Sequence, residues 1–326
     1  METQIKVLLL SFGITVILSL FIIPILKKLK VGQIEREEGL KSHLKKQGTP
    51  TMGGIIMMVA ITIVSVLMFV YYRTREFEVA KNLIPLVTVL LGFGIIGFLD
   101  DFRKLKFKNT DGLKPAVKML GLLIISAAFV VYITKVLNIG TDIFIPIAKT
   151  YFTLPLWIYI PFAIFILLGT TNAINLTDGV DGLATSITTI VVTCLTMISL
   201  MLGDFKEITI IGSLIIGTCL GFLLFNLKPA KVMMGDTGSL MLGGAIASIA
   251  LYLKLPLLLI IICIIPIIET FSVMIQVFHY KRTGNRVFKM APIHHHFELS
   301  GWNENKVVSV FSIITLIACI VGINII

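Results

Sequence analysis

Residues 82–101 read NLIPLVTVLLGFGIIGFLDD. A largely apolar run of this length can cross the hydrocarbon core of a bilayer as one helix, which takes about 20 residues. The run ends at two adjacent carboxylates, Asp100 and Asp101, and a basic segment follows at once. The stretch therefore predicts a membrane-spanning helix whose end carries a doubled negative charge.

The rest of the chain repeats this apolar pattern. Of its 326 residues, 56% are hydrophobic and 14% are charged, which leaves too few charges to cover a soluble domain. We predict ten spanning helices, at about 5–27, 52–72, 82–99, 115–134, 155–173, 183–202, 208–225, 238–253, 255–278 and 306–325. Strands of a membrane barrel are short and alternate in polarity, unlike these runs. We therefore expect an all-α polytopic membrane protein with one integral domain over residues 1–326.

The distribution of basic residues predicts the orientation in the membrane. Twenty of the 28 lysines and arginines lie in four loops that fall on the same side of the ten predicted helices. The positive-inside rule makes that side cytoplasmic and places both termini on the extracytoplasmic side. Much of the net charge of +10 then faces the bilayer surface, where anionic lipid is the expected partner. We expect no nucleic-acid partner. All four cysteines lie inside apolar spans, which predicts packing residues and not disulfides or a zinc site.

The pair Asp100 and Asp101 predicts a cation site. The C-terminal end of a helix already carries negative partial charge, so two carboxylates there need a positive partner. Oxygen ligands without nearby cysteine favour Mg²⁺, which keeps positions free for water and phosphate. Lys104 and Lys108 suit phosphate oxygens, although a role as membrane-surface anchors is equally natural.

A second acidic motif, NLTDGVDGL at 175–183, places Asp178 and Asp181 three residues apart beside glycines. Taken alone, the motif also fits a calcium-type loop or a plain polar turn. Asn172 and Asn175 lie about one helical turn earlier and offer amide groups toward the same point. Such a cluster can bind a nucleobase edge or a ribose.

The last two polar motifs are MMGDTGSL at 233–240 and APIHHHFE at 291–298. Asp236 is either a metal-binding carboxylate or an ordinary helix N-cap. Three contiguous histidines cannot all face one tetrahedral metal, so proximity to phosphate, sugar or peptide is the better interpretation. Glu269 follows Pro266 within an apolar span, and we expect it near a helix break, in a structural role.

Carboxylates, Mg²⁺, lysines and histidines at a membrane boundary suit phosphoryl transfer, in which catalysis is mostly positioning and charge neutralisation. One substrate arrives from water and the other from the bilayer, as a nucleotide diphosphate donor and a lipid phosphate acceptor would. A transporter is the alternative from another class, but transporters concentrate polar groups near the bilayer midplane.

The motifs GTPTMGG, DDFRK, NLTDGVDGLA, FNLKPAKVMMGDTGSL and MAPIHHHFE resemble, in this order, those of the phospho-N-acetylmuramoyl-pentapeptide transferases. That family lies within the polyprenyl-phosphate N-acetylhexosamine-1-phosphate transferase superfamily. The HHH run distinguishes it from the GlcNAc-1-phosphate branch, which is the alternative enzyme. The resemblance implies transfer from UDP-N-acetylmuramoyl-pentapeptide to undecaprenyl phosphate with Mg²⁺, forming lipid I and UMP for peptidoglycan synthesis. It also implies a homodimer in the bacterial inner membrane, with a cytoplasmic active site.

The resemblance also implies roles for individual residues. Asp236 is the expected metal ligand, with Asp100 and Asp101 beside the metal and the lipid phosphate. The remaining implied catalytic residues are Lys104, His294 and His295. The implied substrate-binding residues are Lys46, Thr51, Lys108, Lys118, Asn172, Asn175, Asp178, Gly179, Asp181, Asn226, Met233, Gln276, Ala291 and His296. Family members usually carry an aromatic residue where Met233 stands, so we expect weaker stacking on uracil here.

Overall fold

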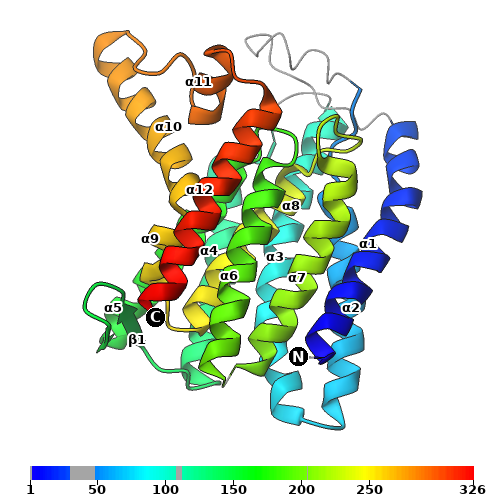
Figure 1. The fold of residues 1–326 in the computed structure, drawn as a ribbon, viewed down its shortest axis with the longest axis vertical. Coiled ribbons are helices and arrows are strands. Elements are labelled where there is room, and N and C mark those ends of the chain that lie inside the picture. The colour runs from blue at the N-terminus through cyan, green and yellow to red at the C-terminus, as the bar shows by residue number, and fades with distance from the viewer. Residues whose placement is uncertain (1, 30–47, 108–111, 204) are drawn as a thin grey trace.

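The computed structural model describes residues 2–29, 48–107, 112–203 and 205–326, and these residues are mainly α-helical (Figure 1). Eight helices in the described ranges are long and apolar enough to cross a membrane. They are α1 (Glu2–Lys28), α2 (Gly54–Arg73), α3 (Phe77–Phe107), α4 (Pro115–Lys135), α5 (Leu156–Thr177), α6 (Leu183–Leu202), α7 (Lys206–Asn226) and α12 (Glu304–Ile325). The all-α membrane fold and eight of the ten predicted spans are therefore confirmed.

The other two predicted spans differ from simple membrane helices. The predicted span 238–253 corresponds to α8 (Gly235–Tyr252), whose residues from Thr237 onward are all buried among other helices. The predicted span 255–278 is broken into η2 (Pro256–Leu258), α9 (Leu259–Ile262) and α10 (Ile264–Thr283), with a bend of 82° before α10. By length and composition, eight helices of the described chain can cross a membrane, or nine if the bent pair is one span, against the ten predicted.

Helix α8 occupies the centre of the bundle and packs against α2, α3 and α5. Glycines allow its first turn to lie very close to its neighbours. A Cβ on Gly97 of α3 would lie 2.2 Å from the carbonyl oxygen of Asp236, and one on Gly54 of α2 would lie 2.1 Å from the nitrogen of Gly238. Small residues permit this close backbone approach between membrane helices. The end of α3 and the start of α8 are therefore held together.

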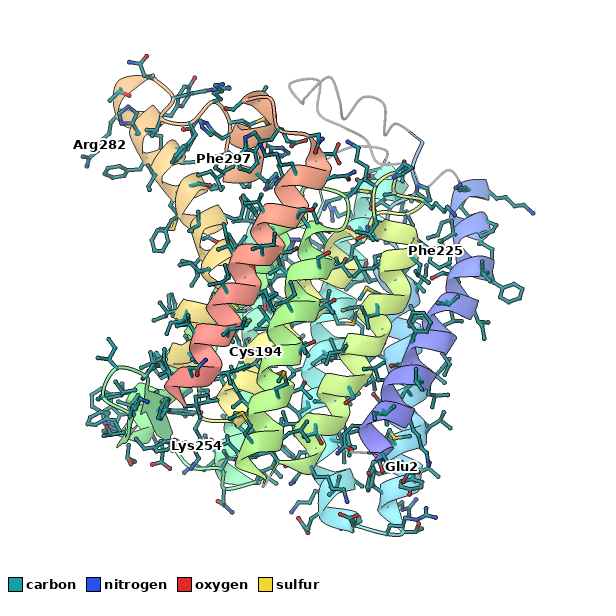
Figure 2. The ribbon with its side chains drawn as sticks, in the orientation of Figure 1. Glu2, Cys194, Phe225, Lys254, Arg282 and Phe297 are labelled. Atoms are coloured by element: carbon teal, nitrogen blue, oxygen red, sulfur yellow. The ribbon has the colours of Figure 1, made fainter. Side chains whose placement is uncertain are left out.

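Both termini lie at one end of the bundle, and the short helix α11 (Ile293–Leu299) lies at the other, beside the end of α10 (Figure 1). Between α4 and α5 the chain forms a hairpin of β1 (Asp142–Ile145) and β2 (Thr150–Thr153), paired antiparallel. Lys254 fixes the hairpin, because its Nζ lies 2.7 Å from Asp142 Oδ2. The hairpin is at the same end as the termini, as the position of Lys254 in Figure 2 shows.

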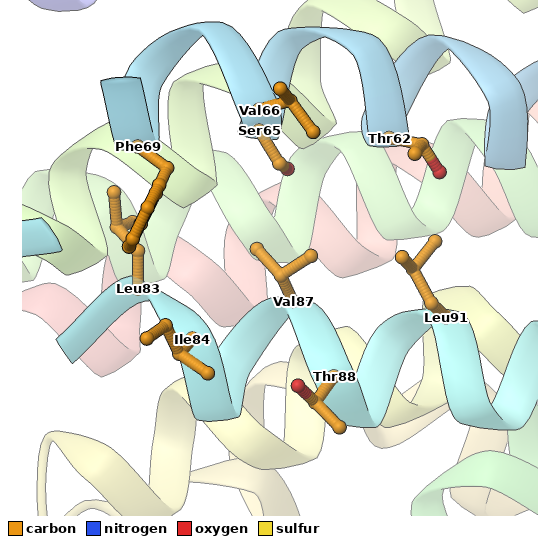
Figure 3. Close-up of a pocket in the computed structure, with 9 residues that line it drawn as sticks. All are labelled: Thr62, Ser65, Val66, Phe69, Leu83, Ile84, Val87, Thr88 and Leu91. Carbon is orange, nitrogen blue, oxygen red and sulfur yellow. The ribbon is translucent and has the colours of Figure 1, made fainter. Parts of the chain in front are cut away.

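The outer surface of the bundle is largely apolar. An open groove of about 210 Å³ lies between α2 and α3, where Ser65 and Phe69 face Leu83 and Val87 (Figure 3). Its last residue on α3, Leu91, comes nine residues before Asp100, a distance of about 14 Å along a helix. The groove is therefore separate from the acidic residues. All four cysteines are free and buried, as predicted for packing residues.

Candidate active site

Three carboxylates meet where α3 approaches the first turn of α8. Each of Asp100, Asp101 and Asp236 contributes an oxygen, and these atoms lie within 4.8 Å of one another. Asp100 and Asp101 are buried, and Asp236 is partly exposed. The expectation that the helix ends at the aspartate pair is wrong, because α3 continues to Phe107. Three carboxylates this close repel one another and need positive partners.

Two lysines provide that positive charge. Lys104 Nζ lies 2.6 Å from Asp100 Oδ2, 3.0 Å from Asp236 Oδ2 and 3.9 Å from Asp101 Oδ1. Lys118 Nζ, from the start of α4, lies 2.7 Å from the same Asp236 oxygen. Both ammonium groups are partly exposed, so they can also be reached by an anion from solution. The structure thus brings together five residues that the sequence analysis selected.

Asp101 caps helix α8. Its Oδ1 accepts a hydrogen bond from the Asp236 backbone N–H at 3.2 Å. Its Oδ2 accepts from the Thr237 N–H at 2.9 Å and from the Thr237 hydroxyl at 2.7 Å. The N-terminal end of a helix has unpaired N–H groups and a positive partial charge, so a carboxylate is stabilised there. The N-cap role considered for Asp236 therefore belongs to Asp101.

The other two carboxylates are also held by neutral donors. Asp100 Oδ1 accepts from the Leu113 N–H at 2.8 Å. Asn175 donates from Nδ2 to Asp236 Oδ1 at 2.9 Å and to Ser239 Oγ at 2.8 Å. Sequence reasoning missed Thr237, Ser239 and the Leu113 amide. The small polar residues that directly follow Asp236 in GDTGSL were a usable signal for the first two.

The segment from Pro50 to Gly54 closes one side of the cluster. The Met233 N–H donates to the Pro50 carbonyl at 2.8 Å, and the Gly53 N–H donates to the Met233 carbonyl at 2.8 Å. A Cβ on Gly235, whose φ is +74°, would lie 2.8 Å from Asp101 Oδ2 and 3.1 Å from Thr51 Oγ1. Thr51 is therefore a neighbour of the carboxylates. Met233 is buried, with 7% of its surface exposed.

The NLTDGVDGL motif forms the loop between α5 and α6. Burial and the carboxylates of Asp236, Asp101 and Asp181 raise the pKa of Asp178 well above its usual range. The charged form of Asp178 is therefore less favourable than that of a solvent-exposed aspartate. Asn172 does not join Asn175 at the cluster, because its side chain donates to the Leu168 carbonyl at 2.7 Å.

Two of the predicted substrate-binding residues instead bind a neighbouring loop. Asp181 Oδ2 accepts from the Ala230 N–H at 3.1 Å. Asn226 accepts from the Thr185 hydroxyl at 2.9 Å and donates to the Val232 carbonyl at 3.0 Å. These bonds hold the segment that leads into Asp236.

The three consecutive histidines of α11 point to three different partners. His294 is fully buried, with Nδ1 3.1 Å from Glu269 Oε2, and a Cβ on Gly179 would lie 2.2 Å from its Nε2. His295 Nδ1 lies 2.9 Å from Glu298 Oε2. His296 Nδ1 accepts from the Lys289 N–H at 3.1 Å. This divergence agrees with the prediction that they do not share one metal.

Of the remaining predicted residues, Gln276 and Ala291 lie in or near the arm formed by α10 and α11. Gln276 accepts from the Val287 and Phe288 N–H groups at 3.0 and 2.9 Å, so it holds the loop after α10. Ala291 is partly buried and precedes a cis proline. Glu269 lies in α10, six residues after the break at Cys263, and supports His294 as described above. Lys46 and Lys108 lie outside the described residues.

The family model described as "Glycosyl transferase family 4" matches residues 83–254. The matched region runs from α3 to just past the end of α8, so it contains all three clustered aspartates and both lysines. A bundle of membrane helices with this cluster at one end is thus a membrane-bound member of that transferase class.

Several curated relatives match nearly the full chain and carry the name phospho-N-acetylmuramoyl-pentapeptide-transferase. One from Acetivibrio thermocellus is 47% identical over 317 residues, covering 97% of this chain and 93% of the relative. One from Clostridium botulinum (strain Eklund 17B / Type B) is 49% identical over 320 residues, covering 98% and 95%. One from Clostridium perfringens (strain SM101 / Type A) is 51% identical over 313 residues, covering 96% and 94%. The chain belongs to the phospho-N-acetylmuramoyl-pentapeptide-transferase family.

Proposed function

We propose that this bacterial multi-pass membrane protein transfers phospho-N-acetylmuramoyl-pentapeptide from its UDP-activated donor to undecaprenyl phosphate. The products are lipid I, for peptidoglycan synthesis, and UMP. The observation that carries the proposal is the meeting of Asp100, Asp101 and Asp236 with Lys104 and Lys118 at one end of a membrane bundle. Family membership identifies the phosphosugar that is transferred at this cluster.

The proposed cofactor is Mg²⁺. The clustered ligands are carboxylate oxygens, which suit a hard divalent cation, and no cysteine of the described chain lies among them. Asp236 and Asp100 would hold the ion, because Asp101 already accepts three hydrogen bonds from the start of α8. When bound, the ion would neutralise charge on the pyrophosphate of the donor.

The transfer is proposed to occur in one step. An oxygen of the lipid phosphate forms a bond to the β-phosphorus of the donor, and the bond from that phosphorus to the bridging oxygen breaks, releasing UMP. A phosphate monoester has a second pKa near about 6, so the attacking group is largely dianionic at neutral pH and needs little help from a base. Lys104 and Lys118 would hold the phosphates in line through their partly exposed ammonium groups.

The nucleoside and sugar sites are proposed on either side of this cluster. Thr51, Asn175 and Asp178 lie near the carboxylates, and Gly179 lies against His294. These four residues would meet the uridine side of the donor. The other residues proposed for that side are Met233, Asp181, Asn226, Asn172 and Lys46. The α10–α11 arm would meet the sugar and peptide through Gln276, Ala291, His294, His295 and His296. Lys108 would add a further contact to phosphate.

The proposed location is the bacterial inner membrane, with the carboxylate cluster on the cytoplasmic face and both termini outside. In support, both termini lie at the end of the bundle opposite α11 (Figure 1). Gly179, which follows Asp178, lies against His294 of α11. The chain is proposed to act as one integral domain and to form a homodimer.

The choice of donor tests this function. Purified protein is supplied with radiolabelled undecaprenyl phosphate, Mg²⁺ and either UDP-N-acetylmuramoyl-pentapeptide or UDP-GlcNAc. We expect a labelled lipid product and UMP from the first donor only. Product from UDP-GlcNAc alone would assign the sister activity, and no product from either donor would refute the transferase assignment. Near-normal turnover by Asp100→Asn would exclude Asp100 as a base or nucleophile, and it would also contradict the metal-holding role proposed for Asp100.

A further inference from the structure

The ammonium group of Lys104 lies among all three clustered carboxylates. Its distances to oxygens of Asp100, Asp236 and Asp101 are 2.6, 3.0 and 3.9 Å. Lys118, in contrast, has an ion pair with Asp236 alone among the described residues, at 2.7 Å. Lys104 therefore contacts all three carboxylates, whereas Lys118 contacts only that of Asp236. Both lysines contact the same Asp236 oxygen.

A cation held by Asp100 and Asp236 would lie between their carboxylate oxygens. The oxygens that could bind it lie within 4.8 Å of one another, so the shared position is the space between them. The Lys104 ammonium is a compact charge with three donors and already takes up two of those oxygens at hydrogen-bond distance. A divalent ion that bridges Asp100 Oδ2 and Asp236 Oδ2 would need the space between them that this ammonium group occupies.

We propose that Lys104 is an internal competitor for the divalent ion, which occupies its place when no metal is bound and is displaced by it. The proposal rests on the proposed function, because it concerns the same metal site. Lys104 lies one turn beyond Asp100 on α3, and its side chain is 35% exposed, so a rotation of its flexible stem can move the ammonium group toward solvent. Lys118 need not move.

This arrangement couples the ion to the donor substrate. A displaced ammonium group loses its carboxylate partners, and the pyrophosphate of the donor offers it new anionic oxygens. Metal binding then exposes a phosphate-binding group, and a bound phosphate removes the competitor from the metal site. By thermodynamic linkage each ligand raises the affinity for the other by the same factor.

Binding of Mn²⁺ to the purified full chain without substrate, followed by the EPR signal of the free ion, tests the displacement. We expect Lys104→Gln to bind Mn²⁺ at least about tenfold more tightly than the wild type, within the usual range of coupling factors. Lys118→Gln is the matched control, since it also removes one positive charge beside Asp236, and its gain should be clearly smaller. Equal gains in the two variants, or no gain in Lys104→Gln, would overturn the proposal.

The variant Asp236→Asn distinguishes a failure of the displacement proposal from a failure of the proposed metal site. Mn²⁺ binding should be lost in that variant, and its retention would refute the metal site and not only the displacement. A second measurement uses the unaltered chain: modification of lysines by an amine-reactive acetylating reagent, read by mass spectrometry with and without Mn²⁺. Displacement predicts faster modification of Lys104 when Mn²⁺ is added, and an unchanged or slower rate would contradict it.

Discussion

The Asp101 carboxylate accepts hydrogen bonds from the Asp236 and Thr237 backbone at the start of α8, whereas the oxygens of Asp100 and Asp236 face the two lysines. The adjacent residues Asp100 and Asp101 therefore have different roles. Asp101 fixes where α8 begins and so positions Asp236. Asp100 and Asp236 remain available to a cation and to phosphate.

Asp101→Asn should destabilise the protein even when no metal is present. The amide keeps one acceptor oxygen but turns an NH₂ toward the start of α8, so a cap is lost, which typically costs about 0.5–2 kcal/mol. We expect a lower unfolding temperature in the presence of a chelator. If the unfolding temperature falls only when Mg²⁺ is supplied, Asp101 acts through the metal and not as a cap.

The raised pKa of Asp178 predicts a pH-dependent stability. An aspartate with a higher pKa in the folded than in the unfolded protein favours folding at low pH, and this contribution is lost as the pH rises above about 4. Asp178→Asn imitates the protonated form. In the presence of a chelator at pH 7, the variant should unfold at a higher temperature than the wild type. As the pH is raised, the unfolding temperature of the variant should fall less than that of the wild type. An equal or lower temperature at pH 7 would contradict the raised pKa.

The sequence was sufficient to predict the acidic cluster but not all of its contacts. The pair Asp100 and Asp101 directly follows an apolar run, and this pattern indicates a cation site. The resemblance to the family adds Asp236 of GDTG to the same site. Asn226 and Gln276, in contrast, bind backbone groups of nearby loops, as Asn226 does at Val232. Such pairings depend on how the chain folds back on itself, which composition and spacing do not specify.

The distance between helices α3 and α8 determines how close the carboxylates of the cluster are to one another. Gly97 of α3 leaves no room for a side chain, since its Cβ would lie 2.2 Å from the Asp236 carbonyl oxygen and 2.7 Å from Thr237 Cα. Both clashes are with backbone, which cannot rotate away. The distance from Asp100 to Asp236 therefore depends on this glycine.

Gly97→Ala should separate the carboxylates. A methyl group at this contact must push α8 away from α3, and overpacking of this kind costs typically about 1–3 kcal/mol. We expect turnover and Mn²⁺ affinity to fall at least about tenfold, as a misplacement of about 1 Å can cause. Gly169→Ala on α5 is the control, because its Cβ would meet nothing within 4 Å. Unchanged Mn²⁺ affinity in Gly97→Ala would show that the cluster tolerates a wider helix spacing.

Most helices could be predicted from hydropathy alone, and the exceptions have physical reasons. Helix α8 is surrounded by protein and needs no lipid-facing apolar surface, so glycine, alanine and serine replace larger residues along it. The break at Cys263 comes three residues before Pro266, which lies in the first turn of α10, where proline is tolerated. Pro266 indicates a break in this span, but the bend of 82° comes before α10, at Cys263.

The molecule has two chemically different ends. One end carries the carboxylates, their lysines and the histidine helix α11, and the other carries both termini and the β1–β2 hairpin (Figure 1). Most lysines and arginines of the described residues lie in or next to the segments that join the helices at the first end, which agrees with the positive-inside rule. In the proposed orientation, a donor from the cytoplasm and an acceptor from the lipid can both reach that end.

Thiol labelling can test this orientation, because the four native cysteines are buried and should react slowly. Ile147→Cys places a thiol at the tip of the hairpin, where 97% of the side chain is exposed, and Asn285→Cys places one just beyond α10. In intact spheroplasts, a membrane-impermeant maleimide should label position 147 at once and position 285 only after permeabilisation. The reverse pattern would place the carboxylate cluster outside the cell.

Release of UMP by the purified chain tests most directly whether three aspartates from two helices form one metal-dependent transferase site. We predict release that requires UDP-N-acetylmuramoyl-pentapeptide, undecaprenyl phosphate and a divalent cation together, and that falls by at least about a hundredfold in Asp236→Asn. Asp142→Asn, at the hairpin on the other end, should retain normal release. Substantial release by Asp236→Asn, or release unaffected by a chelator, would contradict the account.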